Sequence, residues 1–191
     1  DRPQVGIVDV NLIAASTAGE ILQAVEDLQQ RGAAFFVLDL RDNPGGLLTA
    51  GVDVARLFLT DGVVIEQQYR GQKVESFQVE EPGPLAEIPL VVMINSGSAS
   101  AAEIVAGALQ AHGRASLVGV PSMGKDSIQL VFDLKDKSSL HVTAARWWVP
   151  GLDRPANGEG LQPDVVVNAA TDPAIQDETL QEAVRILLGE N

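Results

Sequence analysis

Residues 37–48 read VLDLRDNPGGLL, an apolar run that passes directly into a turn with two adjacent glycines. The short apolar segment at residues 34–40 predicts a buried strand, and the spacing of apolar residues after the turn predicts a helix. Glycine adopts backbone conformations closed to other residues and lets another group approach closely. The turn at residues 41–48 is therefore either an ordinary connection or a point where a ligand meets the backbone.

Residues 90–112 repeat this arrangement. LVVMI at 90–94 reads as a second buried strand, small residues at 95–99 form a turn, and residues 100–112 have the pattern of a helix. Two strand–turn–helix units predict an α/β core. Functional groups in such cores usually follow the carboxyl ends of strands, which makes these two turns the expected place for a site.

The rest of the chain carries weaker patterns, which are interpreted by their hydrophobic spacing and turn residues. They predict strands at 5–10 and 116–120, strand pairs at 63–69 with 73–79 and at 127–134 with 139–149, helices at 16–31 and 171–188, and a Gly/Pro loop at 151–160. The length of 191 residues fits one domain over residues 1–191.

Composition excludes several classes of function. The chain has 13 Lys and Arg against 26 Asp and Glu, a formal net charge of −13, whereas nucleic-acid binding requires a basic patch. No cysteine is present, so thiol catalysis, disulfides and cysteine-based zinc sites are excluded. No apolar run approaches the roughly 18 residues that span a bilayer. Because the chain begins at Asp1 without a visible signal peptide, we expect it to be processed or part of a longer protein.

Ser100 is the first candidate for chemistry. It stands in NSGSASAAE (95–103), where a buried strand gives way to a helix. A serine at a helix start has an exposed hydroxyl, and the helix dipole favours negative charge that develops there. Ser100 and Glu103 also form the S-x-x-E pattern of a capping box. A nucleophile and a plain helix cap both remain open at this position.

Lys125 is the second candidate. GVPSMGKDS (119–127) nearly matches a phosphate-binding loop, but Asp126 occupies a position that must be Ser or Thr, and a strand rather than a helix follows. A lysine held near a site, at the mouth of a strand, is the better interpretation. A buried lysine can lose its charge, because desolvation disfavours the ammonium form. In its neutral form Lys125 could act as a general base on a serine hydroxyl.

The two histidines are poor candidates for a catalytic base. His112 falls at the end of a predicted helix, and His141 lies among polar neighbours without an evident partner. The sequence holds no H-x-x-x-H pair or carboxylate–histidine cluster, so we expect neither a metal nor another cofactor.

Four segments together resemble the C-terminal processing peptidases, or tail-specific proteases, which are serine peptidases with a Ser-Lys dyad. The similar segments are VLDLRDNPGGLL (37–48), PLVVMINSGSASAAEIVAGALQAHGRASLVG (89–119), the Gly-Lys pair at 124–125 with Gln129, and G-x-G-[IL]-x-P-D at 158–164. Their order and spacing agree from about residue 4 to residue 190, which is nearly the whole chain.

The resemblance implies roles for particular residues. Ser100 matches the nucleophile, Lys125 the general base, and Gln129 a residue that orients the lysine in some members. The N–H groups of Gly46 and Ala101 match the oxyanion hole. The implied fold is a mixed α/β core of the ClpP/crotonase type with an additional β-hairpin. The implied substrate is a polypeptide with an unfolded C-terminus, which is cleaved through an acyl-enzyme.

The sequence also departs from the family pattern. Asp126 follows Lys125 where a glycine is usual and could weaken the lysine as a base, and Ala111 replaces a common aspartate. The family's PDZ domain, which selects or gates substrates, is absent from these residues. Two alternatives therefore stay open: a peptide-binding scaffold without catalysis, and a crotonase-like acyl-CoA enzyme. The acidic charge does not favour the second, because CoA phosphates prefer a basic entrance.

The resemblance further implies export to the periplasm, the cell envelope or the thylakoid lumen. An oligomer is compatible with the sequence.

Overall fold

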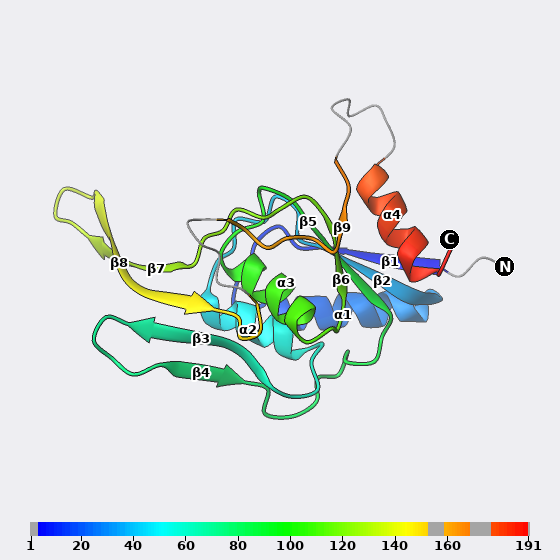
Figure 1. Ribbon diagram of the computed structural model, residues 1–191, viewed down its shortest axis with the longest axis horizontal. Helices are drawn as coiled ribbons and strands as arrows, with labels where there is room; N and C mark the ends of the chain where they lie inside the picture. The colour runs from blue at the N-terminus through cyan, green and yellow to red at the C-terminus, as the bar shows by residue number, and fades with distance from the viewer. Residues whose placement is uncertain (1–3, 153–158, 169–176, 191) are drawn as a thin grey trace.

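The computed structural model describes residues 4–152, 159–168 and 177–190. Within these ranges the chain forms two β-sheets and four helices (Figure 1). The first sheet is parallel, with strand order β1-β2-β5-β6-β9. Its strands are β1 (Gln4–Asp9), β2 (Ala33–Asp39), β5 (Leu90–Ile94), β6 (Ser116–Gly119) and β9 (Val165–Val166).

The second sheet is antiparallel, with strand order β4-β3-β8-β7. Its strands are β3 (Val63–Tyr69), β4 (Glu75–Gln78), β7 (Ser127–Asp133) and β8 (Ser139–Trp148). The helices are α1 (Thr17–Gln30), α2 (Leu48–Arg56), α3 (Ala101–Ala111) and α4 (Glu178–Leu187). Among the described helices, none has the length and apolar character needed to cross a membrane.

The parallel sheet is covered on both faces. Helix α4 packs on one side over a small cluster that includes Val37, Val91 and Val118. Helices α1, α2 and α3 lie on the other side, where the main core also takes in Trp147 of the antiparallel sheet (Figure 1). Burial on both faces explains why every residue of β5 is apolar and buried.

These observations confirm the mixed α/β fold with two strand–turn–helix units and an additional hairpin. The expected strands are present within a few residues of the predicted bounds, and β9 is a short strand that was not predicted. Helix α4 begins at Glu178, and residues 171–176 of the predicted helix lie outside the described residues. Part of the loop predicted at 151–160 also lies outside them.

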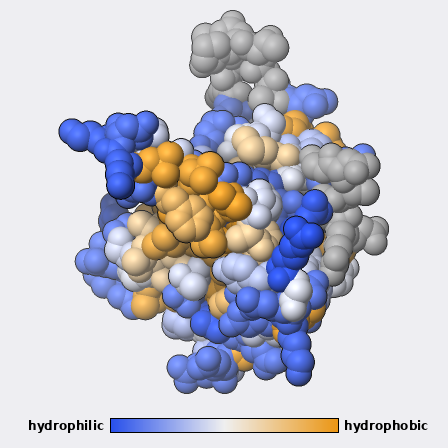
Figure 2. Space-filling view, turned by 90° about the vertical axis from the view of Figure 1, so that its left-hand side faces the viewer, coloured by the Kyte–Doolittle hydropathy of each residue, from blue (hydrophilic) through white to orange (hydrophobic). Residues whose placement is uncertain are grey.

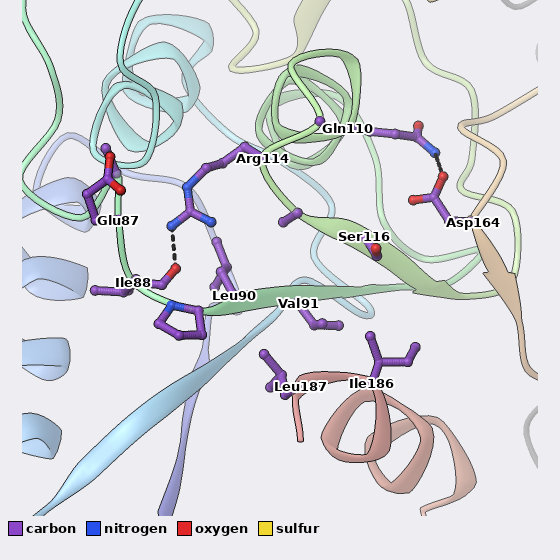
Figure 3. A pocket seen from close by; sticks show the side chains of 14 residues that line it. Glu87, Ile88, Leu90, Val91, Gln110, Arg114, Ser116, Asp164, Ile186 and Leu187 are labelled. Atoms are coloured by element: carbon purple, nitrogen blue, oxygen red, sulfur yellow. Dashed lines mark hydrogen bonds between the residues drawn. The ribbon is translucent and has the colours of Figure 1, made fainter. Parts of the chain in front are cut away.

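Arg114 links neighbouring chain segments near the amino ends of β5 and β6 in the parallel sheet (Figure 3). Its Nε donates to the carbonyl of Phe58 at 3.0 Å, and its Nη2 donates to the carbonyls of Leu85 at 2.9 Å and Ile88 at 2.5 Å. Partial burial lowers the pKa of Arg114, and the nearby Glu87 carboxylate opposes this effect. Arg114 borders a cavity of about 590 Å³ at the amino ends of β5 and β6.

Replacing Arg114 by Met should lower the free energy of unfolding by about 2–3 kcal/mol, because three hydrogen bonds from a charged donor are lost. Urea unfolding followed by circular dichroism would measure the change. Arg146→Met is the matched control, since the Arg146 side chain is 75% exposed and should contribute less than about 1 kcal/mol. Equal losses in both variants would contradict a fastening role for Arg114.

Candidate active site

Three loops meet at the carboxyl edge of the parallel sheet. Residues 42–46 follow β2, residues 95–100 follow β5, and residues 122–125 follow β6. Since β2, β5 and β6 are neighbouring parallel strands, their carboxyl ends lie side by side. The arrangement places the two glycine- and serine-rich turns and the lysine segment at one edge.

Asn43 holds the first loop in place. Its side chain is fully buried, donates to the carbonyl of Val10 at 2.5 Å and accepts from the Gly45 N–H at 2.8 Å. The Asn43 carbonyl accepts from the Ala99 N–H at 2.9 Å, which joins the first loop to the second. A reciprocal pair between Asp42 and Asn95 forms a further link. The two turns therefore form one connected unit.

Arg41 fixes the start of this unit to α4. Its guanidinium pairs with Asp39 at 2.6 Å and with Asp177 at 2.8 Å, and the hydrogen bond to Asp39 is the main cause that raises the pKa of Arg41. Partial burial opposes ionisation of Asp177, but hydrogen bonds from Arg41 and from the Leu180 N–H outweigh it and lower the pKa of Asp177. Both groups therefore stay charged at neutral pH, and the link persists.

Gly45 brings the first turn directly against Ser100. A methyl group placed on Gly45 would lie 2.8 Å from both the Ala101 nitrogen and the Ser100 Cβ, and 2.6 Å from the Ala99 carbonyl oxygen. Gly45 also has a φ of +96°. Only glycine satisfies both the close approach and this backbone conformation.

Ser100 itself has an unusual backbone conformation, with φ 54° and ψ −117°. Non-glycine residues with positive φ are uncommon and often mark functional turns. The Ser100 side chain is half-buried and immediately precedes α3. The capping box expected with Glu103 is present as well. Ser100 thus combines helix capping with a strained backbone conformation.

Two backbone N–H groups in these turns have no hydrogen-bond acceptor among the described residues. In the described part of the chain, neither the Gly46 N–H nor the Ala101 N–H donates a hydrogen bond. The neighbouring Leu47 N–H and Gly45 carbonyl instead pair with Ile13, which fixes the orientation of the Gly46 peptide. Ala101 is the first residue of α3, where a free N–H is expected. Both N–H groups are therefore available to an acceptor from outside the chain, as the predicted oxyanion hole requires.

Glu103 joins the serine turn to the lysine segment. This side chain is 3% exposed, and its carboxylate accepts four hydrogen bonds. The donors are the Ser100 N–H at 2.8 Å, the Ser122 hydroxyl at 2.6 Å, the Gly124 N–H at 2.7 Å and the Lys125 N–H at 2.9 Å. The buried charge is therefore fully hydrogen-bonded, as its burial requires.

Lys125 lies two residues before β7, and its side chain is exposed. The burial that would favour a neutral lysine is therefore not present at Lys125 in this structure. Gln129 lies within β7 and is also exposed. Asp126 pairs with Arg146 at 3.2 Å, so its carboxylate has a cationic partner on β8.

The histidines have other partners. His112 follows the last residue of α3, the opposite end of the helix from Ser100, and contacts the Val63 carbonyl at 3.0 Å. His141 contacts Ser139 at 3.0 Å on the hairpin. Among the described residues, no group of His, Asp and Glu side chains could hold a metal ion.

Sequence reasoning missed Asn43 and the second role of Glu103. Asn43 follows a buried strand and precedes Pro-Gly-Gly, a signal for a structural asparagine in a turn. Glu103 was seen only as a capping residue. Its contacts with residues 122–125 join segments about 20 positions apart, so no local pattern announces them.

Replacing Glu103 by Gln should destabilise the protein by about 2–4 kcal/mol. The substitution turns one carboxylate oxygen, which accepts two hydrogen bonds, into an NH₂ group that can only donate and therefore faces other donors. Hydrogen exchange of the amides at 122–126 should accelerate in this variant, and urea unfolding would measure the loss. Glu26→Gln on the exposed face of α1 is the control and should change little. Unchanged exchange at 122–126 would contradict the bridging role.

Comparisons with known proteins identify related sequences and structures. The sequence profile of peptidase family S41 matches residues 4–167. A carboxyl-terminal-processing protease of Picosynechococcus sp. is 43% identical over 164 residues, covering 86% of this chain and 39% of the relative. Carboxyl-terminal-processing peptidase 1, chloroplastic, of Arabidopsis thaliana is 40% identical over 162 residues, covering 84% of this chain and 33% of the relative.

The solved structure of the photosystem II D1 C-terminal processing protease superposes with a TM-score of 0.75 at 36% identity, covering 96% of this chain and 46% of that protein. The chain thus spans less than half the length of each of these proteins. The match extends over both strand–turn–helix units and the lysine segment. The chain therefore belongs to peptidase family S41.

Proposed function

We propose that this chain is the catalytic part of a serine endopeptidase that cleaves C-terminal segments of polypeptides. Family membership supports the serine peptidase class, and the names of the relatives support C-terminal processing. The observation that carries the proposal is the close approach of Gly45 to Ser100 and Ala101, in a turn where the N–H groups of Gly46 and Ala101 donate no hydrogen bond among the described residues. A carbonyl oxygen placed between them would gain negative charge as Ser100 attacks its carbon.

The proposed reaction is acyl transfer through a Ser100–Lys125 dyad. Neutral Lys125 takes the Ser100 hydroxyl proton while the oxygen bonds to the scissile carbonyl carbon. The tetrahedral intermediate collapses, the peptide C–N bond breaks, and the leaving amine takes the proton back from Lys125. A water molecule then attacks the acyl-enzyme, with Lys125 again as the base. Gln129 would orient the lysine.

A bound polypeptide would complete this site. Lys125 is exposed in the free protein, so a substrate chain laid across Ser100 would cover it and exclude water. The hydrogen bonds to Glu103 keep the backbone at Ser100 and Lys125 in a fixed relation, while the lysine side chain is exposed to solvent. Asp126, which favours the inactive-scaffold alternative because it neighbours Lys125, forms an ion pair with Arg146 instead of standing as an unpaired charge.

The family match does not favour the acyl-CoA alternative. The proposed location is the periplasm, the cell envelope or the thylakoid lumen, supported by cyanobacterial and chloroplastic relatives. One domain over residues 1–191 stays a prediction.

Cleavage of an unfolded polypeptide with an apolar C-terminus tests the dyad. Ser100→Ala and Lys125→Ala should each lose at least about a thousandfold in kcat, whereas Gln129→Ala should lose less. The rate of the parent chain should rise between about pH 6 and pH 10, because the base must be neutral. Mass spectrometry of the products would locate the cleaved bond and measure the rates.

Retention of cleavage in Lys125→Ala would overturn the dyad. Absence of cleavage by the parent chain, together with failure of an active-site-directed phosphonate probe to label Ser100, would favour the scaffold. Asp126→Gly is the informative further variant, since recovered activity would assign the loss to that acid.

A further inference from the structure

The hairpin formed by β7 and β8 carries an unusual amount of exposed apolar surface. Leu130, Phe132, Leu140 and Val142 are between 42% and 51% exposed. They form directly opposed pairs, Leu130 with Val142 and Phe132 with Leu140. These four residues are called the hairpin apolar face. The hairpin stands away from the body of the protein (Figure 1), and an apolar area on this side of the molecule is rimmed by polar residues (Figure 2).

The hairpin apolar face continues the inner face of the antiparallel sheet. Ile128 packs against the main core, and the alternation of β7 places Leu130 and Phe132 on the same side. A bulge between Ile128 and Gln129 shifts the pairing by one residue, which brings Val142 onto this side as well. The opposite side carries polar pairs such as Gln129 with Thr143. The pairing of the two strands therefore places these four apolar side chains together on one side of the hairpin.

The hairpin that carries this apolar face begins next to the proposed catalytic residue Lys125. Strand β7 begins two residues after Lys125 and is an edge strand, so one row of its backbone N–H and C=O groups is unpaired. Leu12, Leu47 and Met123, which flank the site loops, are each more than half exposed. Of the twelve large exposed apolar side chains in the described part of the chain, nine belong to these loops or to the hairpin.

The charges of the hairpin and of the whole chain indicate which kind of molecule binds the hairpin apolar face. Residues 127–148 contain three basic and two acidic side chains, whereas the whole chain has a formal charge of −13. A high net charge of one sign keeps copies of a protein apart, which disfavours a second copy as the partner. The hairpin itself is close to neutral and presents an apolar face with a free strand edge. A strand-like apolar segment fits both features, since its backbone can pair with the edge while alternate side chains contact the face.

We propose that the hairpin apolar face and the free edge of β7 bind an extended apolar segment of the polypeptide substrate. The inference rests on the proposed function and names a surface that selects unfolded substrates. Folded proteins bury their apolar segments and have few free extended strands, so they would not fit. The substrate would run from Ser100 past Lys125 onto β7, and the hairpin would lower KM without taking part in the chemistry.

Binding to the Ser100→Ala form tests the surface without requiring cleavage. The probe is a fluorescently labelled, unstructured peptide of about 20 residues with an apolar C-terminal half, measured by anisotropy. Phe132→Ser should weaken binding about tenfold, as expected for loss of one aromatic contact. Val131→Ser is the matched control, because Val131 is 56% exposed on the opposite side of the same strand, and it should change Kd less than twofold.

The backbone contribution is tested with the same protein. Peptides that are N-methylated at alternate positions lose the N–H groups for strand pairing and should bind at least about tenfold more weakly. Hydrogen exchange of amides within β7 should slow when the unmodified peptide is added. These readouts do not depend on the stability of any hairpin variant, and urea unfolding would verify that Phe132→Ser is folded.

The outcomes separate this inference from the proposed function. Binding that is lost in Phe132→Ser but kept in Val131→Ser supports the surface, whether or not the parent chain cleaves. Equal Kd values for Phe132→Ser and Val131→Ser, or equal binding of methylated and unmodified peptides, would overturn it. A dimer in sedimentation velocity that becomes a monomer in Phe132→Ser would also overturn it, in favour of a second copy. Failure of cleavage with intact hairpin-dependent binding would count against the dyad alone.

Discussion

The buried carboxylate of Glu103 is the group on which the geometry of the site depends. A carboxylate removed from water must find donors, and this one finds four in two loops that are distant in sequence. It also lies in the first turn of α3, where the helix dipole favours a negative charge. The serine turn and the lysine segment are therefore held together by the hydrogen bonds that replace water around the Glu103 carboxylate. Packing of small side chains alone would leave the two loops free to separate.

The parallel sheet supplies the second constraint. Neighbouring strands of one direction end at one edge, so the loops after β2, β5 and β6 start close together whatever their sequences. Asn43 and Ser98 then connect them, since the Ser98 hydroxyl donates to the Leu40 carbonyl at 2.7 Å. Topology brings the loops near, and a few buried polar side chains fix their final positions.

Much of this was accessible from the sequence. The two strand–turn–helix units were predicted because β2 and β5 are short, apolar and followed by small residues. Strand β9 was missed, because a two-residue strand has no period to detect. The bulge in the hairpin was missed for a related reason, since only pairing between β7 and β8 defines it. The exposure of Lys125 could not be predicted, because burial depends on which residues pack against a side chain in space. Ser100 was assigned through resemblance, while its positive φ required the structure.

The backbone conformation of Ser100 also limits which nucleophiles this fold can use. Serine, cysteine and threonine all serve as nucleophiles in hydrolases. A φ of 54° is strained but tolerable for an unbranched side chain, whereas a second heavy atom on Cβ makes it a severe outlier. If the proposed nucleophile at position 100 were exchanged, the backbone conformation would accept cysteine but not threonine. The shape of one turn, set by the crowding of Gly45 against the start of α3, thus restricts the chemistry available to the whole scaffold.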